Sequence, residues 1–219
     1  PLIKMLVRSG VHVTACDKRD RADFGGQAEA LESLGVTLRL GADYLEGLDQ
    51  DVIFRTPGLR PDVPQLLAAQ ERGAVLTSEM EAFFAVCPCQ MIGVTGSDGK
   101  TTTTTIIAGL LKAAGYTTYV GGNIGKPLLP DADGMEHGDI AVLELSSFQL
   151  MTMRRSPDVA VITNLAPNHL DVHASMEEYV SAKENLYLHQ EAEGLVVLNE
   201  DNAITRGFAA KAPGRVTRF

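Results

Sequence analysis

A glycine-rich turn between two expected elements is the sharpest chemical signal in the sequence. The segment Gly93–Thr102 reads Gly-Val-Thr-Gly-Ser-Asp-Gly-Lys-Thr-Thr. Backbone N–H groups of such a turn point at an anion, Lys100 adds a full charge, and Thr101 can reach a magnesium ion. The alternative is a chance turn, but an apolar run before it and a helical pattern after it favour a nucleoside triphosphate site. The residues that would hold the phosphates are Gly96, Ser97, Asp98, Gly99, Lys100, Thr101 and Thr102.

Two further segments place possible metal ligands after expected strands, where α/β proteins bind their ligands. Glu144 lies near the end of the apolar run 140–145, and a carboxylate beside a triphosphate is the usual oxygen ligand for Mg²⁺. Its alternative is an ordinary acid at a strand end. His169 follows the expected strand 159–164 in an Asn-His-Leu-Asp turn that ends at Asp171. Taken alone, a single loop histidine is more often a surface residue.

Two more polar residues are ambiguous when they are considered alone. Asn123 lies in the turn Gly-Gly-Asn-Ile-Gly, and asparagine suits a left-handed turn without any ligand. Lys183 lies in an expected helix, where a lysine is ordinarily a solvated charge.

The first part of the chain has its own candidate turns. Asp17, Lys18 and Arg19 follow an expected strand, at a point where dinucleotide-binding domains place an acid that accepts from a ribose or base. The alternative is a solvated turn. A second turn, formed by Thr56, Pro57 and Gly58, follows another expected strand.

Helical and strand patterns alternate along the chain and predict an α/β fold with two doubly wound parallel sheets. A Cys-Pro-Cys interruption at Cys87 divides an expected Rossmann-like domain, 1–86, from a second domain, 87–219. Ser175 and Glu178 fit a capping box for a long helix. The expected strands are 11–16, 37–40, 51–55, 75–76, 91–95, 117–120, 140–145, 159–164 and 195–199, and the expected helices are 2–7, 27–34, 64–72, 78–85, 101–114 and 176–191.

Composition and charge narrow the class of protein. The 28 acidic and 19 basic residues give a net charge of −9, which disfavours non-specific binding to nucleic acid. No apolar run approaches the roughly 18 to 20 residues that cross a bilayer, and the first residues do not form a signal peptide. We expect reduced cysteines and a cytoplasmic monomer.

The glycine-rich turn at residues 96–102, called the phosphate turn below, is shorter than the general P-loop pattern, because Val94 stands where that pattern has its first glycine. This shortened turn resembles that of the Mur ligases and folylpolyglutamate synthases. Three segments strengthen the resemblance: Gly121–Gly125, Leu143–Leu150 (Leu-Glu-Leu-Ser-Ser-Phe-Gln-Leu), and Asn164–Asp171 with Lys183 downstream. The first two segments are most similar to the branch of the family that joins D-glutamate to UDP-N-acetylmuramoyl-L-alanine. The resemblance therefore implies a cytoplasmic step of bacterial peptidoglycan synthesis, which contributes to cell shape and cell division.

The resemblance implies a domain order. A Rossmann-like UDP-sugar-binding domain, whose first strand and glycine-rich turn would precede Pro1, is followed by an incomplete central ATPase domain of the P-loop type. A carboxyl-terminal amino-acid-binding domain would lie beyond Phe219. We therefore expect this stretch alone to bind Mg·ATP weakly and not to ligate.

The resemblance also implies roles for single residues. Lys100 would act on ATP, two Mg²⁺ ions would be held by Thr101, Glu144 and His169, and Asp171 would support them. Lys183 would be carbamylated by CO₂ and hold the second Mg²⁺. Asn123 and Ser146 would contact substrate, and the turns Asp17–Arg19 and Thr56–Gly58 would hold the uracil and diphosphate. Another ligase of the family, or a nucleotide-binding module without chemistry, remains an alternative.

Overall fold

The structure, a computed structural model, describes residues 1–167 and 173–219 and divides into two compact units, Pro1–Thr77 and Ser78–Phe219. The division falls before α4 (Glu79–Val86), earlier than the boundary predicted at Cys87. The physical reason is that α4 packs on η2 (Leu129–Gly134), where the Glu79 carboxylate accepts the backbone N–H of Leu129 at 2.8 Å. The helix is therefore part of the second unit.

The first unit contains two short parallel sheets over a shared core. Strand β1 pairs with β2, and β3 pairs with β4, whereas no ladder joins β1 to β3 in the described residues. Leu66 and Ala69 of α3 are buried against side chains of β1, β3 and β4. The elements are α1 (Leu2–Arg8), β1 (Thr14–Asp17), η1 (Arg21–Phe24), α2 (Gly26–Glu32), β2 (Thr37–Leu40), β3 (Val52–Phe54), α3 (Pro64–Glu71) and β4 (Val75–Thr77).

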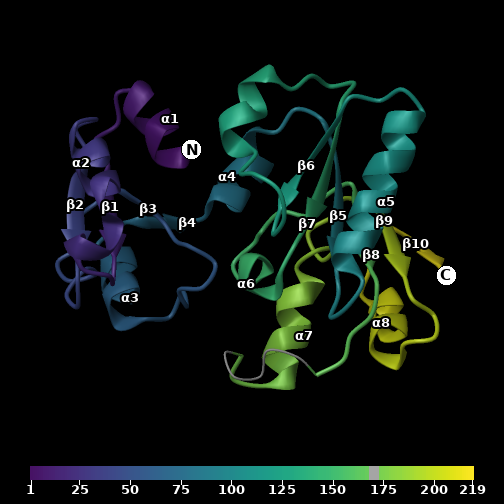
Figure 1. The fold of residues 1–219 in the computed structure, drawn as a ribbon. Coiled ribbons are helices and arrows are strands. Elements are labelled where there is room, and N and C mark those ends of the chain that lie inside the picture. The colour runs from purple at the N-terminus through teal and green to yellow at the C-terminus, as the bar shows by residue number, and fades with distance from the viewer. Residues whose placement is uncertain (168–172) are drawn as a thin grey trace. The chain divides into compact units, whose positions relative to one another are not determined.

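The second unit is built on one six-stranded sheet whose neighbouring strands are all parallel (Figure 1). The strand order is β10-β9-β8-β5-β7-β6, and every residue of β7 is buried. Its elements after α4 are β5 (Gln90–Thr95), α5 (Lys100–Ala113), β6 (Thr118–Gly122), η2, β7 (Ile140–Glu144), α6 (Ser147–Leu150), β8 (Val159–Ile162), α7 (Met176–Glu184), β9 (Leu195–Leu198), α8 (Ala203–Gly207), η3 (Phe208–Ala210) and β10 (Arg215–Arg218).

Both faces of this sheet are covered. Ala108 of α5 packs on Val142 of β7, while a side chain added at Gly93 of β5 would meet Leu186 and Pro157 on the other face. The chain leaves β5 toward β6 on one side and later crosses to β8 on the other, so the strand order reverses at β5. In such sheets ligands bind at the carboxyl ends of the strands beside this reversal.

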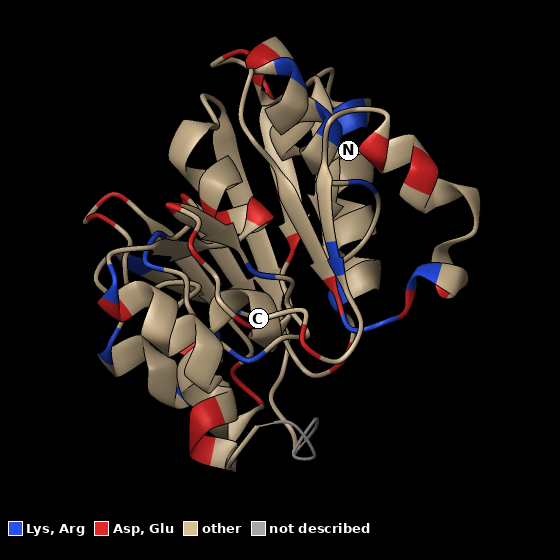
Figure 2. Cartoon of the chain, turned by 90° about the vertical axis from the view of Figure 1, so that its left-hand side faces the viewer, with Lys and Arg blue, Asp and Glu red and all other residues tan. Residues whose placement is uncertain are grey.

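The register brings the predicted site residues to that edge. Glu144 of β7 stands opposite Val94 of β5 and Gly122 of β6, so the turns that follow β5 and β6 flank the end of β7. In the described residues, Lys and Arg are interspersed with Asp and Glu along the ribbon (Figure 2). None of the described helices has the length and apolar character needed to span a membrane.

The structure differs from the predicted elements mainly after residue 144. The helix predicted over 176–191 ends at Glu184, because the Asn185 carbonyl accepts the Ser156 hydroxyl at 3.1 Å and the Asn185 amide donates to Leu150. Its predicted cap is half formed. Ser175 Oγ accepts the Glu178 N–H, but the Glu178 carboxylate accepts the N–H of Ala174. No element was predicted over η1, η2, α6, α8, η3 or β10.

The buried centre of β7 should dominate the stability of the second unit. Leu143 is fully buried, so Leu143→Ala should lower the free energy of unfolding by about 2–5 kcal/mol. Leu110→Ala, at a position on α5 that is 66% exposed, is the matched control and should change it by no more than about 0.5 kcal/mol. Denaturant titration measures both, and equal losses would contradict the central place of β7.

Candidate functional site

The turn after β5 is held in one shape by residues that leave β8. The Thr163 hydroxyl donates to the Asp98 carbonyl at 2.6 Å, and the Asp98 N–H donates to Asn164 Oδ1 at 2.9 Å. A Cβ at Gly96 would collide with Thr163 Oγ1, so this position requires glycine. Gly99 caps α5 in the left-handed conformation, with φ 76°. The glycines of the predicted turn therefore serve close approach and backbone reversal.

Lys100 folds back over this turn. Its Nζ donates to the carbonyl oxygens of Gly96 at 3.0 Å and Ser97 at 2.9 Å. The ammonium group of Lys100 is therefore hydrogen-bonded to backbone carbonyls at the start of α5. The N-terminus of a helix favours negative charge at this position. A polyphosphate bound there would compete for the same ammonium group.

Three of the predicted residues converge on the buried end of β7. Glu144 is only 1% exposed, and its two carboxylate oxygens accept from Thr101 Oγ1 and Asn123 Nδ2, each at 2.7 Å. The Asn123 N–H also donates to the Glu144 carbonyl at 2.7 Å. A Cβ at Gly122 would collide with that carbonyl, which explains the glycine before Asn123. The arrangement joins the phosphate turn, β7 and the turn after β6 in one hydrogen-bonded unit.

This unit fits a magnesium ion by the chemistry of its donors. A carboxylate and a hydroxyl beside a phosphate turn are hard oxygen ligands, and Mg²⁺ binds through one or two such protein groups plus phosphate and water. In the described part of the chain, no three His, Cys, Asp or Glu side chains gather into a larger metal site. His169 and Asp171 lie outside the described residues, so their roles stay predictions.

Lys183 is buried against the phosphate turn, which contradicts the ordinary interpretation of a solvated helix charge. Only 2% of it is exposed, and its Nζ donates to Thr95 Oγ1 at 3.1 Å and to the Gly96 carbonyl at 3.0 Å. Burial, with a smaller contribution from the charge of Lys100, lowers the pKa of Lys183 from 10.5 to about 7. Near neutral pH a substantial fraction is therefore an uncharged amine.

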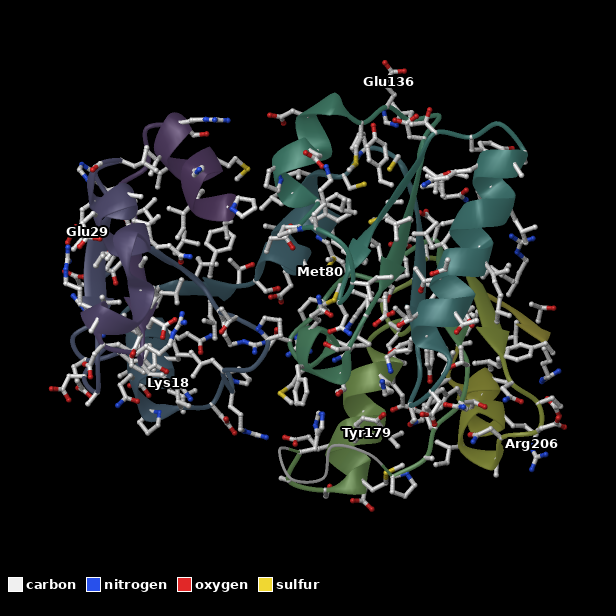
Figure 3. The ribbon with its side chains drawn as sticks, in the orientation of Figure 1. Lys18, Glu29, Met80, Glu136, Tyr179 and Arg206 are labelled. Atoms are coloured by element: carbon white, nitrogen blue, oxygen red, sulfur yellow. The ribbon has the colours of Figure 1, made fainter. Side chains whose placement is uncertain are left out.

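Tyr179 belongs to the site although the sequence interpretation gave it no role. It lies on α7 (Figure 3), four residues before Lys183, and its hydroxyl is 2.9 Å from Ser97 Oγ. The Lys183 ammonium lies 4.8 Å from the centre of its ring. The i, i+4 spacing of Tyr179 and Lys183 was the available signal, because it places both side chains on one helix face.

Ser146, a predicted substrate residue, is the N-cap of α6. Its hydroxyl accepts the Gln149 N–H at 3.3 Å, and the Gln149 side chain accepts the Ser146 N–H at 3.0 Å. The next residue, Ser147, is 2.8 Å from Nε2 of the buried His173, whose ring stacks on Phe148. His173, another residue without a predicted role, thus links α6 to the segment before α7.

In the first unit, the two predicted turns end strands of separate sheets. Asp17 accepts three hydrogen bonds from Arg19, one from its N–H and two from its guanidinium, and these lower the pKa of the Asp17 carboxyl. That guanidinium lies 4.3 Å from the centre of the Phe24 ring, and Lys18 is exposed. Thr56 and Pro57 are also exposed, and their carbonyls accept from a side chain that the sequence interpretation missed, the buried Arg55.

Comparison with known proteins decides the family. Residues 94–219 match the model of the Mur ligase middle domain. The chain belongs to the Mur ligase family. It is 54% identical to the UDP-N-acetylmuramoylalanine--D-glutamate ligase of Acetivibrio thermocellus and 53% identical to that of Clostridium botulinum strain Loch Maree. Each alignment covers 100% of this chain and 47% or 48% of the relative, so the chain spans about half the length of these curated relatives.

Solved structures show the same fold at lower sequence similarity. The UDP-N-acetylmuramate:L-alanyl-gamma-D-glutamyl-meso-diaminopimelate ligase of Neisseria meningitides aligns with a TM-score of 0.62 and 21% identity over 100% of this chain and 73% of its own. The murein peptide ligase of Psychrobacter arcticus aligns with a TM-score of 0.57 and 17% identity over 99% of this chain and 50% of its own. The resemblance to Mur ligases and the parallel α/β fold are thus confirmed.

The match to the Mur ligase model covers the phosphate turn, Glu144 and Lys183. It does not reach the Asp17–Arg19 and Thr56–Gly58 turns of the first unit. The proposed ligands of those two turns therefore depend on the likeness to full-length relatives and on local geometry.

The buried amine should give this Mur ligase chain a characteristic pH dependence. Between about pH 7 and pH 10.5 the unfolded chain keeps the Lys183 proton that the folded chain has lost, so stability should rise with pH in this window. In CO₂-free buffer, the free energy of unfolding of the wild type, minus that of Lys183→Met, should increase from about pH 7 to about pH 9.5.

Lys112→Met, at an exposed lysine of α5, is the control and should show no comparable increase. A difference between wild type and Lys183→Met that stays constant over the same pH range would contradict the lowered pKa.

Proposed function

We propose that this chain is the amino-terminal and central part of an ATP-dependent ligase that joins D-glutamate to UDP-N-acetylmuramoyl-L-alanine. The identity of 50–54% to relatives bearing that name supports the substrate assignment. The observation that carries the chemistry is the convergence of Thr101, Asn123 and Lys100 with the buried Glu144 at one edge of the sheet. These are the groups that hold and neutralise a triphosphate.

The reaction then needs two displacements and no nucleophilic residue of the protein. The carboxylate of UDP-N-acetylmuramoyl-L-alanine attacks the γ-phosphate of ATP, releasing ADP and forming an acyl phosphate. The neutral amine of D-glutamate attacks the acyl carbonyl, the C–O bond to phosphate breaks as the amide forms, and the nitrogen gives up one proton to the departing phosphate. The protein contributes orientation and electrostatic stabilisation, which supply most of the rate in phosphoryl transfer.

The residues of the site divide this work. The N–H groups of Ser97 and Asp98 donate to Asn164, so the phosphates would be met by the N–H groups at the start of α5. Lys100 would exchange the Gly96 and Ser97 carbonyls for phosphate oxygens. Thr101 and Glu144 would hold one Mg²⁺, which when bound neutralises phosphate charge and polarises the γ-phosphoryl group. Asn123, once released from Glu144, would donate to a substrate oxygen, and Ser146, just beyond β7, would contact the substrate as well.

Lys183 is suited to carbamylation. Its neutral amine would add to the carbon of CO₂ and lose a proton, giving an anion in place of a cation. The lowered pKa supplies the neutral amine that this addition requires. We propose that the carbamate, with His169 and with Asp171 in support, holds a second Mg²⁺.

The first unit would bind the uracil and diphosphate through the Asp17–Arg19 and Thr56–Gly58 turns. We also propose that the whole enzyme is a cytoplasmic monomer that contributes to cell-wall synthesis, and through it to cell shape and division. A further domain of the whole enzyme would bind D-glutamate, so this chain alone should release no ligated product.

The test is phosphate release by the full-length parent with Mg·ATP and UDP-N-acetylmuramoyl-L-alanine. D-Glutamate should stimulate it, whereas L-glutamate, L-lysine and the absence of an amino acid should not. Stimulation by another amino acid would retain the family and change the assigned member. If no amino acid stimulates phosphate release, the result would favour the alternative that the chain is a nucleotide-binding module without ligase chemistry. D-Glutamate-dependent product from the 219-residue chain alone would contradict the need for a further domain.

A further inference from the structure

An exposed turn of the first unit is supported by a buried arginine. Thr56, Pro57 and Gly58 are exposed, whereas Arg55 beneath them is only 4% exposed. Arg55 Nη1 donates to three carbonyls of the turn, those of Thr56 at 3.2 Å, Pro57 at 3.1 Å and Leu59 at 2.6 Å. One guanidinium nitrogen therefore contacts the carbonyls of three of the four residues that follow Arg55.

This arrangement is not needed to satisfy the backbone. Carbonyls of an exposed turn can accept from water, whereas burying a guanidinium removes a charge from water at a considerable cost in free energy. What the arginine adds is a fixed turn conformation, with the carbonyls drawn to the inner side. That conformation would affect the affinity of any ligand that binds the turn.

The turn is also fixed at both ends. The Arg55 N–H donates to the Thr77 carbonyl at 2.7 Å and so extends the pairing of β3 with β4. The Leu59 N–H donates to the Thr56 carbonyl at 3.1 Å, and the Leu59 side chain packs on the core formed by Leu48, Leu66 and Ala69. The carbonyls of Thr56 and Pro57 are held toward the guanidinium, so an anion approaching the turn from outside meets less carbonyl repulsion.

The place of the turn agrees with an anion-binding role. It follows the carboxyl end of β3, a parallel strand, and α/β proteins bind ligands at such ends. Gly58 has no strained backbone, and a Cβ added there would have nothing within 4 Å. The fold thus leaves the outer side of the turn open. An alanine at position 58 would therefore contact a bound ligand without disturbing the protein itself.

We propose that Arg55 is a positioning residue that holds the Thr56–Gly58 turn in the shape that receives the diphosphate of the nucleotide-sugar substrate. This inference rests on the proposed function, since it names the group of that substrate that the turn binds. The effect should therefore appear in substrate affinity and leave the phosphoryl-transfer step in the second unit unchanged.

The experiment compares variants of the full-length parent. Arg55→Met should raise the KM for UDP-N-acetylmuramoyl-L-alanine at least about 10-fold, while kcat and the KM for ATP stay within about 2-fold. Arg55→Lys, which keeps the charge but not the fork of donors, should give a smaller increase. Gly58→Ala should also raise this KM. Arg72→Met is the control, because Arg72 donates to a loop carbonyl of the same unit, that of Leu48, outside this turn.

Calorimetric titration with UDP supplies a second measurement that does not depend on turnover. Arg55→Met and Gly58→Ala should each weaken UDP binding, and Arg72→Met should not. If the parent shows no D-glutamate-dependent turnover but binds UDP in an Arg55-dependent way, the proposed function fails while the role of Arg55 stands.

Three results would overturn the inference. One is a folded Arg55→Met enzyme, checked by circular dichroism, whose substrate KM and UDP affinity equal those of the wild type. Another is an equal rise in the KM for ATP, which would show a general structural defect. If Arg55→Met does not fold, normal UDP binding by both Arg55→Lys and Gly58→Ala would overturn it.

Discussion

The buried carboxylate of Glu144 is the constraint on which the rest of the second unit depends. A carboxylate with 1% exposure must have hydrogen-bond donors, and Thr101 and Asn123 provide them from two different elements. This requires β7 to lie between β5 and β6, and it requires glycine at position 122. The position of the Glu144 carboxylate beside the phosphate turn therefore depends on three features together: the strand order of the sheet, the turn after β6 and the start of α5.

The same turn gathers two lysines on one carbonyl. Gly96 accepts from Lys100 at 3.0 Å and from Lys183 at 3.0 Å, although neighbouring ammonium groups repel each other. The repulsion and the burial of Lys183 favour its neutral form, whereas Lys100 lies at the helix start, where it can exchange carbonyls for phosphate oxygens. In the proposed function, one short turn thus gives two identical side chains different chemistry: Lys100 is the cation that meets the nucleotide, and Lys183 is the amine that is carbamylated.

Local patterns predicted the strand, turn and helix around Lys100 well, because glycine spacing and apolar runs act over a few neighbouring residues. The burial and the hydrogen-bond partners of other residues depend on contacts between distant parts of the sequence, which local patterns do not reveal. Lys183 reads as a solvated charge until α7 is packed on the turn, and Arg55 reads as a strand-end residue until its carbonyl partners are known. The end of α7 depends on Ser156, which is distant in sequence. The identity of the family was predictable from motifs, whereas the supporting roles of Tyr179 and Arg55 required the structure.

The most direct test of the central claim is whether Glu144 couples nucleotide binding to a divalent cation. In calorimetric titrations of the full-length parent with ATP, with and without Mg²⁺, the wild type should bind Mg·ATP more tightly than metal-free ATP. Glu144→Gln keeps the shape of the side chain but removes the charge, and it should abolish that difference. A Glu144→Gln enzyme that folds and retains the full advantage of Mg²⁺ would contradict the assignment of this carboxylate to the metal and phosphate site.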